Sequence, residues 1–444
     1  MQISVCVLPI TLGFIAGAPK AGIGLFAMFL ATFLLFHAIR RDGFSYLSLL
    51  LGILPAMVVV RGTLIPFNSL VFLLGTGLLW PLSGRSEFRL FWKRHMLLSV
   101  LCVSVLYWWL SYLPTGNYSQ NLRSLEWSFC IAVVCLLGAR RSYLSTSLVG
   151  CGISLIAVGA GLMPYGDRLG MASIDDVSFG NPIQLGLPSA LLVLLSLTEG
   201  GQWLLLQKRI WSRIALALCC AFILIFSTSR GSWLVLIVGI VLLAIGDRRA
   251  RKPMLVGTLL LAATVGVVIL SPRGAFVQHY FMKVADPNNS AEARTTGRVT
   301  QWRAFPEILR DSPVWGFGPG SGRQISVQYA HENIPFHALY LHVGAETGMI
   351  GLTLLSILLF GLLREGWIHW RLTREFVPLL GTTAFIMMGL TVSGLDSLGG
   401  LLLGLGFLGG SRENLWRVLE LPSGTESVRE VQAREPRALP ARIA

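Results

Sequence analysis

Residues 211–246 read WSRIALALCCAFILIFSTSRGSWLVLIVGIVLLAIG, two apolar runs interrupted at one point by STSRGSW. An α-helix needs roughly 17–25 apolar residues to cross a hydrocarbon core of about 30 Å, and each run approaches that length. Similar runs recur along the 444 residues, which are 54% hydrophobic and 13% charged, whereas soluble proteins carry about 25% charged residues. The pattern predicts an all-α, polytopic membrane protein and excludes a water-soluble enzyme, a coiled coil and a disordered scaffold.

The apolar runs set the expected domain organisation. We expect fourteen spans at most, and about twelve because several runs are short for a bilayer. The candidate spans are 3–18, 21–39, 44–60, 64–82, 96–113, 125–139, 143–163, 183–198, 211–227, 231–246, 254–270, 339–363, 376–394 and 397–410. The chain then divides into helices and short loops at 1–270 (with an outer polar element at 164–182), a large loop at 271–338, further spans at 339–411 and a polar tail at 412–444.

The basic residues predict the orientation of these spans. Of the 36 lysines and arginines, 24 fall at alternate segment ends and in the C-terminal tail, and an excess of basic residues marks the cytoplasmic side. Both termini are therefore expected in the cytoplasm, and the loop at 271–338 on the opposite face. The net charge of +14 then reflects topology, and nucleic-acid binding is not expected.

Three polar segments share the outer face on this map. They are 164–182, the break STSRGSW at 227–233, and the loop 271–338, which contains an expected amphipathic helix at 297–311 and the glycine cluster GFGPGSG at 316–322. Irregular polar chain at a membrane occurs only in loops or lining cavities, so the chemistry is expected where these segments meet.

Arginines in these segments are candidate ligands for an anion. Arg230 lies at the helix break beside small residues, where it is either an interfacial arginine or a bidentate clamp for a phosphate group. Arg298 and Arg303 lie five residues apart on the expected loop helix, and are either a solvated helical face or further phosphate ligands. Arg168, in the earlier polar element, completes this set.

His337 begins the segment HALYLHVGAETG at the end of the loop. With an ordinary pKa near 6.5 it is either a general base at the membrane surface, or a helix cap or an interfacial residue. The sequence has no HExxH, CxxC pair or DxD pattern, and GFGPGSG lacks a following Lys-Ser/Thr. We therefore expect no metal, cofactor or bound nucleotide.

The ordered motifs resemble one family. SRGSW at 229–233, GRVTQW at 297–302 followed by DSPVWGFGPG at 311–320, and H-x-x-Y-L at 337–341 followed by E-x-G-x-x-G-L at 346–352 are similar to the O-antigen ligase and polymerase superfamily. These are bacterial inner-membrane glycosyltransferases of the GT-C type. The segment from Asp167 to Gly186 resembles the family's earlier periplasmic element. Ala338 departs from the pattern, because many relatives place Asn after the histidine.

The resemblance implies a ligase that transfers a glycan from undecaprenyl diphosphate to the lipid A-core, on the periplasmic face, without metal or nucleotide sugar. It implies that Arg230 and Arg298 hold the diphosphate, with Arg168 and Arg303 as further candidates, and that His337 deprotonates the acceptor hydroxyl. Asp396 falls where ligases often place a functional acid. No covalent nucleophile is evident, so an inverting reaction is expected.

Three other functions remain open at this point. An O-antigen polymerase and a protein O-oligosaccharyltransferase would use the same donor, and a transporter of polyprenyl-linked glycans would use the same lipid. A transporter is expected to carry charges along a pathway within its spans, whereas here the charges gather at one face. The expected partners are therefore the lipid-linked O-antigen, the lipid A-core and membrane lipids.

Overall fold

The computed structural model describes Ser48, Gly52 and residues 96–111, 141–162, 173–174, 177–178, 182–197, 210–246, 251–271, 274–290, 298–333, 336–392 and 397–410. This part of the chain is helical except for a hairpin of two short antiparallel strands, β1 (Ser173–Ile174) and β2 (Val177–Ser178). The predicted all-α class is confirmed for these residues. The spans expected between 3 and 82 and at 125–139 lie, apart from Ser48 and Gly52, outside the described residues.

Most of the helices coincide with the apolar runs of the sequence. They are α6 (Met96–Leu110), α9 (Arg141–Leu162), α10 (Pro182–Leu197), α11 (Ile210–Ser227), α12 (Arg230–Gly246), α13 (Arg251–Leu270), α18 (Leu339–Thr373), α19 (Val377–Gly389), α20 (Ser397–Phe407) and the 3₁₀ turn η3 (Leu408–Gly410). Their agreement with the runs follows from apolar composition, which favours a helix wherever the backbone must satisfy its own hydrogen bonds.

Several of the described helices have exposed apolar faces. By length and composition, α18 is the one helix of the described part that could cross a membrane, and eight shorter apolar helical segments accompany it. On α13, Leu255, Leu259 and Leu270 are 64%, 62% and 88% exposed. Water would strongly disfavour such a continuous apolar face, whereas hydrocarbon chains would cover it without penalty.

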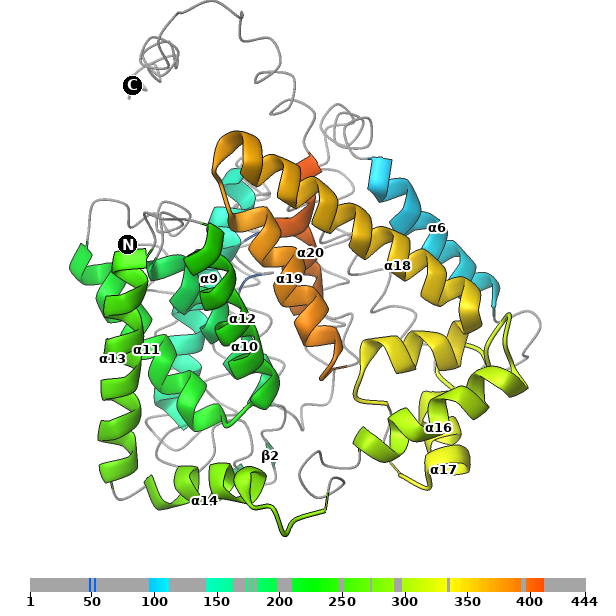
Figure 1. Cartoon of the computed structure of the whole chain (residues 1–444), viewed down its shortest axis with the longest axis horizontal. Helices are drawn as coiled ribbons and strands as arrows, with labels where there is room; N and C mark the ends of the chain where they lie inside the picture. Colours follow the sequence, from blue (N-terminus) through cyan, green and yellow to red (C-terminus); the bar gives the residue numbers. More distant parts are fainter. Residues whose placement is uncertain are drawn as a thin grey trace, which may run out of the picture.

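The apolar helices form one packed bundle. Helix α10 packs against α11 and α12, α12 reaches α19, and α18 packs against α6 and α19 (Figure 1). The large side chains of Trp108, Phe385 and Phe407 are buried in its core. These contacts bring the start of α12 and the end of α19 together although some 160 residues of chain separate them.

The described part of the large loop forms a helical layer at one end of this bundle. It contains α14 (Gly274–Ala285), α16 (Arg298–Asp311) and α17 (Gly322–Ala330), which lie with the hairpin at the same end in Figure 1. Helix α16 confirms the amphipathic helix predicted at 297–311, and it buries Ala304 and Ile308 against Ile325 of α17 and the start of α18. The loop thus has a small apolar core of its own.

Helix α18 changes direction at Gly348. This residue has φ of 64° and ψ of −160° inside an otherwise helical run. A side chain is strongly disfavoured in that conformation, so glycine is required there. Figure 1 shows the consequence, since the first part of α18 lies with α16 and α17 while the remainder runs obliquely through the bundle.

Candidate active site

The α11–α12 break is a tight turn of small polar residues. Ser227, Thr228 and Ser229 are buried, and Thr228 has a left-handed φ of 47°. The hydroxyl of Ser227 accepts the N–H of Ser229 at 3.3 Å and donates to the carbonyl of Leu224 at 2.7 Å. A left-handed backbone is unusual for a β-branched residue, and such strain often accompanies functional sites. Arg230 follows this turn as the first residue of α12, and it is half-buried there.

Two glycines let neighbouring helices approach this break closely. A Cβ atom added to Gly186 of α10 would lie 2.5 Å from Oγ of Ser227 and 2.7 Å from Oγ of Ser232. A Cβ atom added to Gly231 would overlap Oγ1 of Thr391 and lie 2.9 Å from its Cβ. The N-terminus of α12 is therefore in direct contact with Thr391, two residues beyond the end of α19.

The loop helix α16 reaches the same point from the other side. The guanidinium of Arg298 donates from Nη2 to the carbonyl oxygen of Thr391 at 3.3 Å. Arg298 is half-buried at the first position of α16. Thr391 is thus contacted from two sides, by Gly231 of α12, which follows Arg230, and by the side chain of Arg298. Arg230 and Arg298, two of the predicted phosphate ligands, therefore lie on elements that both contact this one residue.

His337 lies between the loop and α18. The N-cap of α18 is Ala338, so His337 is not the helix cap that was one of its predicted roles. Its neighbours Phe336 and Ala338 are 0% and 1% exposed, which fixes the backbone on both sides of the half-buried histidine. Burial, and then the positive charge of Arg298, lower the pKa of His337 below its usual 6.5. The imidazole is therefore neutral at pH 7, which is the form that accepts a proton.

Gln301 connects α16 to His337. Its side chain is 0% exposed, its Oε1 accepts the backbone N–H of His337 at 3.2 Å, and its Nε2 donates to Oγ of Ser326 on α17 at 3.2 Å. Sequence reasoning missed this residue. The signal was a glutamine three residues before Ala304 on the apolar face of α16, where an amphipathic helix ordinarily places a hydrophobic residue.

The glycine cluster at 316–322 packs around the bend of α18. Gly316, Gly318 and Gly320 have left-handed φ values of 67°, 91° and 83°. The N–H groups of Phe317 and Gly318 donate to the carbonyls of Ala345 and Glu346 at 2.9 and 3.0 Å. The left-handed glycines therefore allow this segment to lie close along the backbone of α18 and to hydrogen-bond with it.

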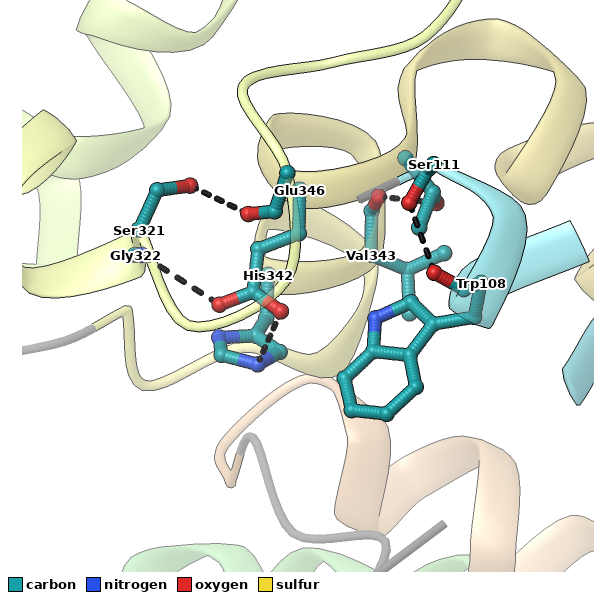
Figure 2. A network of polar contacts seen from close by, with 9 residues as sticks. Trp108, Ser111, Ser321, Gly322, His342, Val343 and Glu346 are labelled. Carbon is teal, nitrogen blue, oxygen red and sulfur yellow. Dashed lines mark hydrogen bonds and ion pairs between the residues drawn. The ribbon is translucent and has the colours of Figure 1, made fainter. Parts of the chain in front are cut away.

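A buried ionisable pair holds the end of this cluster. Nε2 of His342 lies 3.3 Å from Oε2 of Glu346, and both side chains are almost fully buried. Oε1 of Glu346 accepts the N–H of Gly322 at 3.2 Å, at the first turn of α17, as Figure 2 shows. A carboxylate at a helix N-terminus is favoured by the helix dipole, so Glu346 anchors α17 to α18.

The other predicted site residues differ in placement. Arg303 is exposed on α16, and five residues of helix rotate it about 140° away from Arg298. The structure does not bring it to Thr391. Arg168 and Asp396 lie outside the described residues. Among the residues that the structure does describe, no group of three or more His, Cys, Asp or Glu side chains could hold a metal ion.

The arrangement combines two arginines on adjoining elements with a neutral imidazole. Guanidinium groups bind phosphate through bidentate hydrogen bonds, and the first turn of α12 adds backbone N–H groups that favour an anion. The neutral ring of His337, within the electrostatic reach of Arg298, can accept a proton from a bound hydroxyl. Phosphate binding and proton abstraction are thus available at neighbouring positions.

One protein-family model matches part of the chain. Residues 215–356 match the family model described as O-antigen ligase. The matched range begins in α11 and ends in α18, and it contains the α11–α12 break, α16, α17 and His337. Thr391, where α12 and Arg298 meet, lies beyond it. No curated protein matches the chain.

Proposed function

We propose that the chain transfers the O-antigen glycan from undecaprenyl diphosphate to a sugar hydroxyl of the lipid A-core, and the match of residues 215–356 to the O-antigen ligase family model supports this. That family acts by glycosyl transfer in the attachment of O-antigen to lipopolysaccharide, and the match implies a lipid-linked O-antigen and the lipid A-core as substrates. The ligase reaction, its mechanism and the residues that carry it are our proposal.

Arg230 and Arg298 bind the diphosphate of the donor in this proposal. The supporting observation is the contact of both elements with Thr391, which places the two residues on adjoining surfaces. Two guanidinium groups can stabilise the negative charge that develops on the departing diphosphate, which is the main electrostatic requirement of the reaction. Arg168, Arg303 and Asp396 are proposed as residues that make further contacts with the substrates.

His337 is the general base of the proposed reaction. The acceptor oxygen forms a bond to the anomeric carbon while the bond from that carbon to the phosphate oxygen breaks. The hydroxyl proton passes to the imidazole, and undecaprenyl diphosphate leaves with the electron pair. This single displacement inverts the anomeric centre. General base catalysis of this kind contributes about 10²–10⁴-fold, and holding both substrates in line contributes further.

The proposed location is the bacterial inner membrane, with about twelve spans, both termini in the cytoplasm and the active site on the periplasmic face. The distribution of 24 of the 36 basic residues supports this orientation. Ser290 is exposed after α14 and suits a topology test. A single cysteine introduced as Ser290→Cys, in a background without native cysteines, should react with a membrane-impermeant maleimide from the periplasm. Labelling from the cytoplasmic side alone would overturn the orientation.

Reconstitution tests the function directly. The purified protein is placed in vesicles with undecaprenyl-diphosphate-linked O-antigen and lipid A-core, without added metal or nucleotide. Transfer of the glycan to the core supports the proposal. Growth of the glycan on its lipid carrier would instead identify a polymerase, transfer to a protein acceptor would identify an oligosaccharyltransferase, and movement of the lipid-linked glycan without transfer would identify a transporter.

Two variants test the assigned roles in the same assay. His337→Ala should abolish transfer while undecaprenyl diphosphate still binds, because the ring acts on the acceptor. Arg230→Ala should weaken that binding, because the guanidinium acts on the diphosphate. Wild-type turnover in the His337 variant would remove this residue as the base.

A further inference from the structure

Gln301 is a polar residue in an apolar position, and both ends of its amide are engaged. Its side chain is fully buried between α16, α17 and the segment before α18. A buried amide is stabilising only when its donors and acceptors are satisfied, so a fully bonded one specifies a single arrangement of the groups around it. Here those groups are the backbone of His337 and the hydroxyl of Ser326.

The orientation of the amide follows from its partners. A backbone N–H can only donate, so the group that faces His337 must be the carbonyl oxygen Oε1. The amino group Nε2 then faces Ser326, whose hydroxyl oxygen accepts. Ser326 is itself 0% exposed in the middle of α17. The amide therefore joins the histidine segment to α17 in a single orientation.

Gln301 also shares a helix face with Arg298. Residues three apart on a helix lie on the same side, so the side chain that reaches His337 is one turn from the side chain that reaches Thr391. The same face continues through Ala304 and Ile308 into the small core of the loop. Helix α16 thus presents the proposed diphosphate ligand and the bond to the base segment from adjacent turns of one rigid element.

We propose that Gln301 is a positioning residue that fixes the backbone of His337 relative to Arg298. The proposed base is then held at a fixed position relative to the proposed diphosphate ligand. This inference rests on the proposed function. Gln301 acts through His337 and does not itself contact the substrates. A displacement of about 1 Å at a reacting group costs on the order of 10²-fold in rate, so a single buried hydrogen bond to the base segment is sufficient to matter.

The charged groups around the histidine give the proposal a second readout. Arg298, on α16, lowers the pKa of His337 together with burial. The ionisable groups that follow on α18, His342 and Glu346, are engaged with each other. If the histidine segment moves away from α16 when Gln301 is removed, both lowering influences weaken, and the pKa of His337 rises toward 6.5.

The test compares Gln301→Met with Ser326→Ala in the full-length protein. Methionine has nearly the length and volume of glutamine but cannot accept the His337 N–H, whereas Ser326→Ala leaves that bond intact and removes only the bond to α17. Gln301→Met removes both bonds of the amide, to the His337 N–H and to the Ser326 hydroxyl, whereas Ser326→Ala removes only the second, so the difference between the variants isolates the bond to His337. Thermal unfolding monitors the general destabilisation of each variant. Three quantities are measured: kcat for glycan transfer, binding of undecaprenyl diphosphate, and the pKa of His337.

The pKa is measured by NMR on protein labelled with ¹³Cε1-histidine, using His337→Gln to assign the resonance. In Gln301→Met we expect kcat to fall on the order of 10²-fold, donor binding to stay close to wild type, and the pKa of His337 to rise. In Ser326→Ala we expect kcat and the pKa to stay close to wild type.

Three results would overturn the proposal. One is a wild-type kcat and an unchanged pKa in Gln301→Met. Another is an equal loss of kcat in Ser326→Ala, which would show that Gln301 acts only through the packing of α17. The third is a parallel loss of donor binding and kcat in Gln301→Met. If the wild-type protein transfers no glycan, the proposed function fails, while the NMR comparison still decides whether Gln301 holds His337 beside Arg298.

Discussion

The contact between α12 and Thr391 makes Gly231→Ala the most direct test of the site. The added methyl carbon would lie 2.9 Å from Cβ and 3.1 Å from Cγ2 of Thr391, and closer still to Oγ1. Carbon atoms pack at about 3.5–4.0 Å, so α12 and the end of α19 must separate by roughly 1 Å. Overpacking of this kind costs about 1–3 kcal/mol of stability. The same displacement moves Arg230 away from Arg298 and should lower transfer on the order of 10²-fold.

The assay measures thermal unfolding, binding of undecaprenyl diphosphate and the transfer rate for Gly231→Ala. A matched control on the same helix is Gly239→Ala, whose methyl group would meet the flexible end of Leu194. This variant should lose stability but keep donor binding, because the overlap lies more than two turns from Arg230. Adding Thr391→Ala to Gly231→Ala removes Oγ1 and Cγ2 and should restore part of the rate, since the carbonyl that Arg298 contacts remains. Wild-type donor binding in Gly231→Ala, or an equal loss in Gly239→Ala, would refute the reasoning.

Three further outcomes are expected. The pKa of His337 is lowered below 6.5, and its neutral form is the base, so kcat/KM should be full above that pKa and should fall as the pH decreases through it; an acidic limb above pH 6.5 would contradict the assignment. Arg298→Lys should weaken binding of undecaprenyl diphosphate because lysine lacks the bidentate fork, whereas Arg310→Lys, exposed in the last turn of α16, should bind like the wild type; equal losses would remove the distinction. Gly348→Ala should lower stability by about 1–3 kcal/mol, because the backbone conformation there is nearly restricted to glycine; Gly266→Ala, inside α13 with nothing within 4 Å of its added Cβ, should be at least as stable as the wild type.

The helices were predictable because hydrophobic runs and helical periodicity are local properties. Helix α12 begins at Arg230, one residue before the run that predicted it, and α16 occupies 298–311 where an amphipathic helix was expected at 297–311. The break at 227–229 was also visible, since small polar residues interrupt two apolar runs there. The number of spans and their orientation stay predictions, because they depend on a bilayer and on residues outside the described part.

The assembly of the site was less predictable because it depends on contacts between distant segments. Thr391 has no unusual sequence context, and its role follows only from the packing of α12 against α19 and the reach of Arg298. Gln301 carried only the signal of a polar residue on the apolar face of the expected helix, and its bonds to His337 and Ser326 follow only from the packing of α16, α17 and the segment before α18. In contrast, His337 was evident from its residue type and its place at the start of an apolar run, although its bond to Gln301 was not.

In the proposed membrane location, the bend at Gly348 has a consequence for how the protein would adapt to membranes of different thickness. The part of α18 beyond it, residues 349–373, is about 37 Å long at 1.5 Å per residue, which exceeds a hydrocarbon core of about 30 Å. Such a helix adjusts to thicker or thinner lipid by changing its tilt. On both sides of Gly348 the backbone of α18 is bonded to the loop, since the N–H of Phe317 donates to the carbonyl of Ala345 and the N–H of Met349 donates to the carbonyl of Pro313. In the proposed membrane location, hydrophobic mismatch would therefore be taken up by the far part of α18, while the bend and the loop helices keep their arrangement around His337.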